Sequence, residues 1–290
     1  MPADSALISV TAKVSAYYRQ FTDIQFAQEA AELIGASAAF EQILSEHGLK
    51  RENLTFYAPM FEARYKSITE LIRKSGSSQV IELASGYSLR GLDLTRCGDI
   101  RYVETDLPGV IQTKLGLLEE IRRHHAIPPD AQHVVTPADA LVFEEIHASA
   151  ASLDTRARLT VLCEGLIMYL SKDQTEVLAR NIRRLLGGFA SGCWMTPDFT
   201  FRSEAANLSP DRVRLREAIT GVTQTQLDAS AFEDEQDLIA FLGRLGFRVE
   251  VRSQVDETPS FSSLKSLGLA PTVIERFGGA LRVWVMTIDS

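Results

Sequence analysis

A turn of small residues and a carboxylate further along the chain are the features of this sequence that point most directly to chemistry. The apolar segment 80–83 runs into Ala84, Ser85 and Gly86 before a helical pattern begins. Gly86 can adopt backbone angles closed to other residues, and the low bulk of its neighbours lets a ligand approach the main chain. Asp106 follows twenty residues after Gly86, the separation expected of a carboxylate that holds ribose hydroxyls. Together they predict an adenosine-containing cofactor.

Glu164 is a second carboxylate in a position that calls for a partner. It directly follows the apolar run 160–163, and a carboxylate buried without a partner is costly to desolvate. A positively charged ligand group and a structural ion pair would each supply that partner, and the sequence leaves both open. Glu104 alternates onto the same strand face as Asp106 and is the reserve candidate for the ribose.

The scaffold that would position these residues is an alternation of strands and helices. Such an alternation is typical of a parallel sheet, and ligands of open parallel sheets bind at the carboxyl ends of the strands. We therefore expect an α/β fold with a mostly parallel seven-stranded sheet and helices on both faces. The predicted strands are 79–83, 101–105, 133–135, 160–163, 189–196, 247–251 and 281–288.

The chain divides into a helical beginning and a sheet-forming remainder. Residues 1–78 carry mainly helical spacing and are predicted to form an N-terminal cap, followed by a core at 79–290. The polar stretch near 197–230 predicts a lid-like insertion. Two helices have clear starts, one at Pro108 and one at a capping box formed by Ser171 and Gln174.

The segment 161–170 reads VLCEGLIMYL, and it resembles the EGLxxYL signature of the leucine carboxyl methyltransferase family. The segments FEARY, ELASGYS and ETDLPGVI resemble further motifs of that family, and the resemblance extends from about residue 18 to 186. It implies a Rossmann-like class I methyltransferase fold and S-adenosyl-L-methionine as the cofactor. The chain departs from the family at Ala84 and Ser88, where methyltransferases commonly carry glycine.

The resemblance also implies roles for individual residues of the site. Arg64 would grip the cofactor carboxylate through its paired hydrogen-bond donors, and Asp139 with the Ala140 backbone would meet the adenine. Capping of a helix at 140–148 is the alternative for Asp139. Arg90 is a substitute for Arg64, with an exposed surface arginine as its alternative. The cofactor-binding candidates are Arg64, Glu82, Gly86, Asp106, Asp139, Ala140 and Glu164, and Tyr169 is a candidate pocket residue.

The five histidines bear on the methyl acceptor. Helices that follow strands run back to the opposite edge of the sheet, which leaves His47 as the histidine free to approach the site. A carboxylate is already ionised at neutral pH, whereas a phenol usually benefits from a base. We therefore predict O-methylation of a carboxylate. The resemblance to bacterial members of the family implies that the acceptor is a small, polyketide-like acid. The alternatives are a phenol or hydroxyl O-methyltransferase and a non-catalytic regulatory protein that binds S-adenosylmethionine.

The charge and the cysteine content of the chain indicate which partners and which cellular compartment to expect. The formal charge of −8 and scattered basic residues argue against nucleic acid and membrane surfaces as partners. Three cysteines in apolar segments are typical of reduced, buried thiols, and the sequence contains no apolar run of membrane-spanning length. We expect a cytoplasmic enzyme that needs no metal.

Overall fold

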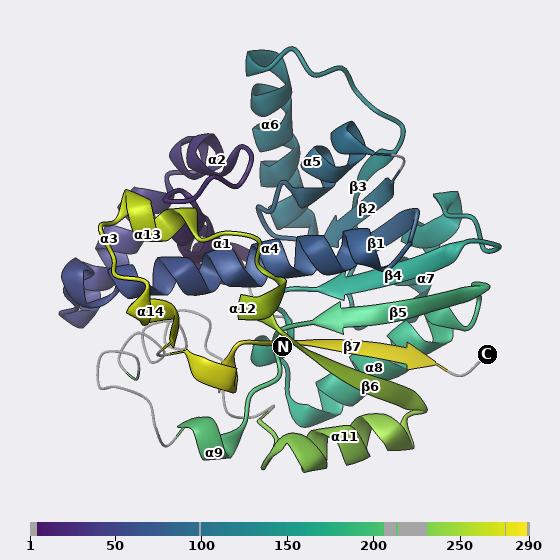
Figure 1. Cartoon of the computed structure of the whole chain (residues 1–290). Helices are drawn as coiled ribbons and strands as arrows, with labels where there is room; N and C mark the ends of the chain where they lie inside the picture. The colour runs from purple at the N-terminus through teal and green to yellow at the C-terminus, as the bar shows by residue number, and fades with distance from the viewer. Residues whose placement is uncertain (1–4, 99, 206–212, 214–230, 276, 289–290) are drawn as a thin grey trace.

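The computed structural model describes residues 5–98, 100–205, 213, 231–275 and 277–288, and its centre is one seven-stranded sheet (Figure 1). The strand order is β3-β2-β1-β4-β5-β7-β6. Strands β1 to β5 pair in parallel, whereas β7 runs antiparallel to both β5 and β6. The strands are β1 (Gln79–Leu83), β2 (Arg101–Asp106), β3 (His133–Pro137), β4 (Arg158–Cys163), β5 (Ser191–Thr196), β6 (Phe247–Ser253) and β7 (Arg282–Ile288). The prediction of a mostly parallel sheet is confirmed.

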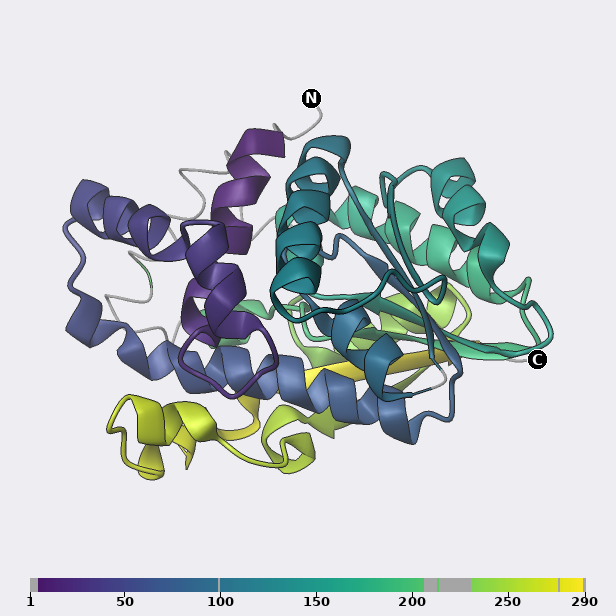
Figure 2. The same cartoon turned by 90° about the horizontal axis from the view of Figure 1, so that it is seen from above.

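Side-chain alternation along the strands builds two apolar layers. On β4, Val161 and Cys163 face a core with α7 (Phe143–Ser149), α8 (Lys172–Leu186) and α11 (Glu235–Arg244), whereas Leu162 faces the other side. That other side is covered by α4 (Ala58–Lys74) and α5 (Arg90–Cys97). Helices therefore cover both faces, as Figure 2 shows from above.

The N-terminal helices gather at the carboxyl ends of the parallel strands, on the left of Figure 1. They are α1 (Ser5–Arg19), α2 (Ala27–Leu33) and α3 (Ala36–His47), and the 3-10 turns Arg51–Asn53 and Thr55–Tyr57 lead from them into α4. Aromatic rings hold them together: Tyr17 stacks on Phe40 with centroids 3.9 Å apart, and Tyr18 stacks on Phe61 at 4.8 Å. Helix α4 lies in the predicted cap, and it contacts both these helices and the sheet. The division of the chain after residue 78 stays a prediction.

Short helices fill the C-terminal connection between β6 and β7. They are α12 (Gln254–Glu257), α13 (Ser262–Ser266), α14 (Thr272–Glu275) and a 3-10 turn at Gly278–Ala280. Glu62 of α4 fixes this connection, because its carboxylate accepts hydrogen bonds from the main-chain nitrogens of Ser262 at 2.8 Å and Ser263 at 2.9 Å. The helix α9 (Arg202–Ala205) begins the predicted insertion near 197–230, most of which lies outside the described residues.

Helix starts follow the predicted caps with one exception. Helix α6 (Pro108–His124) begins at the predicted proline, and the Ser171 and Gln174 capping box is present at α8. The helix expected at 140–148 was placed too early, because α7 begins at Phe143. In the part of the chain that the structure describes, no helix is both long enough and apolar enough to span a bilayer.

Candidate functional site

The glycine turn and Asp106 are in direct contact at the carboxyl ends of β1 and β2. Ala84 and Gly86 both adopt left-handed backbone angles, with φ of 55° and 52°. Asp106 is buried, and its carboxylate accepts from the main-chain nitrogens of Gly86 and Leu107, each at 2.7 Å. Burial raises the pKa of Asp106, and these two hydrogen bonds oppose the shift. A carboxylate has about four acceptor positions, so Asp106 has positions left for further donors.

Helix α1 lies over this turn. A Cβ atom added at Gly86 would be 3.5 Å from the Cβ atom of Ala12. Beside the turn, a cavity of about 10 Å³ is lined by residues that include Arg19, Tyr65 and Tyr87. That volume corresponds to about one water molecule.

A buried arginine joins two of the predicted carboxylates. Arg90 has no exposed side-chain surface, and it donates to Glu82 at 2.8 Å and to Glu164 at 2.5 Å. It also contacts Thr69 Oγ1 at 3.1 Å, the Tyr65 carbonyl at 3.5 Å and the ring of Tyr65, 4.1 Å from the guanidinium carbon. The expectation of an exposed Arg90 is therefore wrong, because Glu82 within β1 and Glu164 directly after β4 require this buried counter-charge.

Glu164 forms an ion pair with Arg90. The sequence left open whether the partner of Glu164 would be a protein group of this kind or a positively charged ligand group. Burial would raise the pKa of Glu164, but Arg90, Arg19 and Arg64 together lower it below its ordinary value. Arg90 contacts the Oε2 atom. The contact of Glu164 with a cofactor stays a prediction. The atom available for that contact is Oε1, which has no hydrogen-bond partner among the described residues.

Arg64 contacts Asp198, a residue that follows β5. Its side chain is 21% exposed, and its guanidinium forms an ion pair with the carboxylate of the fully buried Asp198 side chain. The same carboxylate accepts from the main-chain nitrogens of Gly165 and Leu166. The predicted grip of Arg64 on a cofactor carboxylate is therefore in competition with a protein carboxylate, and it stays a prediction.

The reserve candidate Glu104 is enclosed by protein groups. It forms an ion pair with Lys114 Nζ at 2.7 Å and lies 3.3 Å from His133 Nε2, and all three side chains are fully buried. Burial would raise the pKa of Glu104, but Lys114 and His133 outweigh it and hold the pKa at about 2. This arrangement assigns Glu104 to the interior and leaves Asp106 as the carboxylate at the strand end.

Asp139 lies after β3 in a turn of its own. Its carboxylate accepts from the Leu141 nitrogen at 2.8 Å, while its own nitrogen donates to Glu145 at 2.8 Å. It does not cap α7, whose N-cap is Val142. Ala140 is buried beside it, and the contact of both residues with an adenine stays a prediction. Tyr169 lies half-buried in the 3-10 turn Ile167–Tyr169, and its pocket role also stays a prediction.

Arg19 is a site residue that the sequence did not reveal. It is 8% exposed at the end of α1, where its Nε donates to the Ser15 carbonyl at 3.3 Å and its guanidinium lies over Tyr65. Burial lowers the pKa of Arg19, while Glu164 opposes the shift. No carboxylate lies within ion-pair distance of it among the described residues. Such a buried cation is suited to an anionic ligand group.

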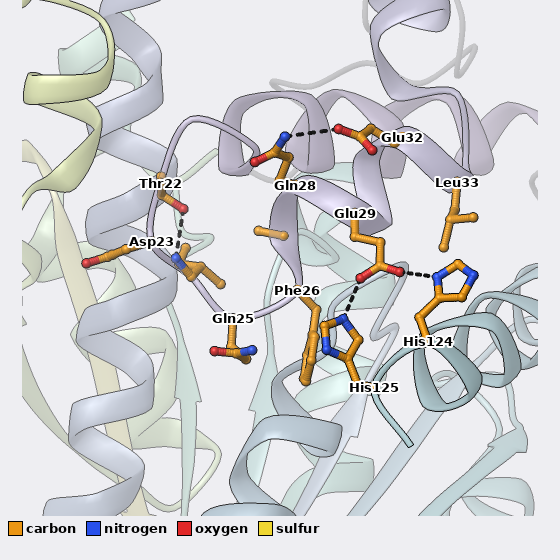
Figure 3. A pocket seen from close by; sticks show the side chains of 12 residues that line it. Thr22, Asp23, Gln25, Phe26, Gln28, Glu29, Glu32, Leu33, His124 and His125 are labelled. Atoms are coloured by element: carbon orange, nitrogen blue, oxygen red, sulfur yellow. Dashed lines mark hydrogen bonds and ion pairs between the residues drawn. The ribbon is translucent and has the colours of Figure 1, made fainter. Parts of the chain in front are cut away.

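A surface pocket of about 740 Å³ lies between the α1–α2 segment and the end of α6. Figure 3 shows Glu29 between His124 and His125, and the Glu29–His125 distance is 2.7 Å. These two histidines contact α2, and their predicted separation from the cofactor site stays a prediction. Of the other three, His133 begins β3 and His147 packs on Phe143 in α7, while His47 is exposed at the end of α3 and its approach to the site stays a prediction.

Comparison with known proteins decides the family. The sequence profile described as leucine carboxyl methyltransferase matches residues 21–183, which is more than half of the chain. The chain belongs to the leucine carboxyl methyltransferase family. Family membership confirms the resemblance read from the EGLxxYL segment, and it supports the predicted cofactor.

Curated relatives of this leucine carboxyl methyltransferase family member are provisionally named S-adenosyl-L-methionine-dependent methyltransferases. One from Mycobacterium ulcerans is 34% identical over 112 residues, or 39% of this chain and 36% of the relative. One from Frankia alni is 26% identical over 169 residues, or 58% of this chain and 55% of the relative. The matches thus cover about a third to about half of these relatives' lengths.

Solved structures confirm the fold of this family member. A structure of PigF with SAH has a TM-score of 0.51 at 13% identity, covering 88% of this chain and 59% of PigF. The methyltransferase domain of bacterial CtHen1 has a TM-score of 0.50 at 12% identity, covering 80% of this chain and all of that domain. The predicted Rossmann-like class I methyltransferase fold is therefore confirmed.

Proposed function

We propose that this protein is an S-adenosylmethionine-dependent O-methyltransferase that methylates a carboxylate of a small organic acid. The observation that carries the proposal is the convergence of the left-handed glycine turn, buried Asp106 and buried Arg19 at the carboxyl ends of the parallel strands. This is the edge at which open parallel sheets bind ligands.

The residues at this edge fit the chemical groups of the cofactor. Asp106 has acceptor positions available for ribose hydroxyls beyond the two used by Gly86 and Leu107. Arg19 is a buried cation suited to the cofactor carboxylate, and it takes this role because Arg64 is engaged by Asp198. The free oxygen of Glu164 would accept from the ammonium group.

The chain's own residues have a limited chemical task. The cofactor, when bound, supplies an electrophilic methyl group on a sulfonium. Asp106, Arg19 and Glu164 would hold the nucleoside and amino-acid ends, while α1 covers the turn and excludes water. Holding two reactants in line contributes up to about 7–11 kcal/mol in well-oriented reactions.

A carboxylate acceptor agrees with the placement of the histidines. His133 begins β3 and His147 packs on Phe143 in α7, whereas His124 and His125 pair with Glu29 of α2. A carboxylate with an ordinary pKa of about 4 needs no base at neutral pH, whereas a phenol of about 10 does. An acid substrate therefore places the smallest chemical demand on these residues.

Calorimetry with S-adenosylmethionine, followed by a labelled methyl-transfer assay, tests the proposal. The assay would compare a panel of small carboxylic acids with phenols of matched size. We expect binding and transfer to acids, at a rate that is flat between about pH 6 and 9 because the acceptor is already ionised. Transfer to phenols alone would overturn the carboxylate assignment, binding without transfer would favour the regulatory alternative, and no binding would overturn the cofactor.

A further inference from the structure

A carboxylate that the sequence did not single out organises the turn after β4. The side chain of Asp198 is fully buried, and its Oδ2 atom accepts from the main-chain nitrogens of Gly165 at 2.8 Å, Leu166 at 2.7 Å and Ile167 at 3.2 Å. Its Oδ1 atom accepts from Gly165 at 2.9 Å and from the Arg64 guanidinium. Three consecutive N–H groups thus converge on one side chain from the neighbouring loop.

Consecutive main-chain N–H groups that point inward form a concave anion-binding nest. The backbone turns sharply at Gly165, whose φ of 84° lies in the left-handed region that favours glycine. In this chain the protein's own Asp198 occupies the nest. Glu164 immediately precedes it, so the carboxylate that fixes the Gly165 nitrogen also fixes the peptide plane from which Glu164 extends.

Arg64 supplies the counter-charge that this arrangement requires. Glu164 and Asp198 are two carboxylates that follow the neighbouring strands β4 and β5. A buried charge without a partner is costly. Arg64 pairs with Asp198 and also lowers the pKa of Glu164. Because Arg64 belongs to α4, the ion pair ties that helix to the loops after β4 and β5.

We propose that Asp198 is a positioning residue: through the nest at 165–167 it sets the direction of Glu164, and Arg64 is its counter-ion. This inference rests on the proposed function, because it assigns Asp198 an effect on cofactor binding that is exerted through Glu164. A purely structural Asp198 would lower stability and change affinity independently of Glu164.

A double-mutant cycle separates the two roles. Asp198→Asn preserves volume but removes the charge and places an amide donor against N–H groups. We expect its dissociation constant for S-adenosylmethionine, measured by calorimetry, to rise about tenfold or more, as a lost interaction of about 1.4 kcal/mol would produce. In a Glu164→Gln background the same change should have less than about a twofold effect, since the group through which Asp198 acts is already altered.

Asp106→Asn is the control background. In it, Asp198→Asn should raise the dissociation constant for S-adenosylmethionine by the same factor as in the unsubstituted chain. Asp106 and Asp198 share no hydrogen-bond partner within the described ranges, and changes at independent sites add. Arg64→Lys serves as the milder variant if Asp198→Asn does not fold. It retains the charge but loses the guanidinium fork, and an intermediate loss of affinity is expected.

Hydrogen exchange of the amides at 165–167 gives a readout that needs no cofactor. In the unliganded protein, exchange at these three amides should be faster in Asp198→Asn than in the unsubstituted chain. An affinity loss of equal size with and without Glu164, or unchanged affinity in a protein that binds the cofactor, would overturn the positioning role alone. Failure of the unsubstituted chain to bind S-adenosylmethionine would overturn the proposed function and this inference with it.

Discussion

The main-chain nitrogen of Gly86 donates to the Oδ2 atom of Asp106 across 2.7 Å. The two features predicted to contact different parts of one cofactor are therefore a single unit of structure. A change at Asp106 acts on the turn as well as on a ligand. Experiments on this carboxylate need a neighbouring carboxylate as their control.

Asp106→Ala is expected to lower affinity for S-adenosylmethionine by about tenfold to a hundredfold. The change removes charge-assisted hydrogen bonds worth roughly 1.5–3 kcal/mol. Calorimetry measures the effect. Glu104→Gln is the control, because Glu104 is enclosed by Lys114 and His133. That variant should lose stability while its affinity changes less than about threefold; the reverse pattern would assign the ribose to Glu104.

Arg90→Met is expected to destabilise the fold by about 3–5 kcal/mol. Removing one partner leaves the other buried charges uncompensated, and here both Glu82 and Glu164 lose their guanidinium. Urea unfolding measures the change. The control is Arg180→Met, which removes an exposed pair with Glu176 and should cost less than about 1 kcal/mol. Equal losses for the two variants would contradict the role given to Arg90.

Strands such as β1 and β4 were predictable because they are short, largely apolar runs beside turn residues. Residues 79–83 match β1 at both ends, and 133–135 mark the beginning of β3. The start of α7 was misplaced, since Asp139 offered a helix cap but instead closes a turn of its own onto Leu141. A local pattern cannot distinguish these two uses of one side chain.

The internal ion pairs of the site were not predictable from local patterns. Arg90 meets Glu164 across 74 positions of sequence, and Arg64 meets Asp198 across 134. Only the sheet order, which places β1 beside β4 and β4 beside β5, brings them together. Glu164 after an apolar run did indicate that a partner was needed, although its identity required the packing of α4 and α5.

Gly91→Ala and Gly116→Ala are expected to change stability in opposite directions. A Cβ atom at Gly91 would lie 2.6 Å from Glu104 Oε1 and 2.7 Å from His133 Nε2, so this buried cluster must shift at a cost of about 1–3 kcal/mol. Gly116 is exposed in α6 and has open space around it. Alanine there should stabilise by about 0.4–1 kcal/mol. Thermal unfolding of both variants gives the sign, and a stable Gly91→Ala would refute the tight packing of the cluster.

The ion pair between Glu104 and Lys114 should make part of the stability dependent on acid pH. The pKa of Glu104 is about 2 in the folded chain, lowered from 4.5. A carboxylate with a lowered folded pKa stabilises the protein above its unfolded pKa, and this contribution is lost as pH falls from about 4.5 toward 2. Glu104 thus makes its full contribution to the free energy of unfolding at neutral pH.

Urea unfolding of the unsubstituted protein and Glu104→Gln between pH 7 and pH 3.5 isolates this contribution. The other carboxylates are common to both proteins and cancel in the difference. We expect the difference in unfolding free energy to be constant from pH 7 to about pH 5.5, and then to narrow by about 1 kcal/mol between pH 4.5 and 3.5. Glu176→Gln, at an exposed ion pair, should stay within about 0.5 kcal/mol of the unsubstituted chain throughout. A Glu104→Gln difference that stays constant down to pH 3.5 would mean that Glu104 is not held ionised by Lys114 and His133.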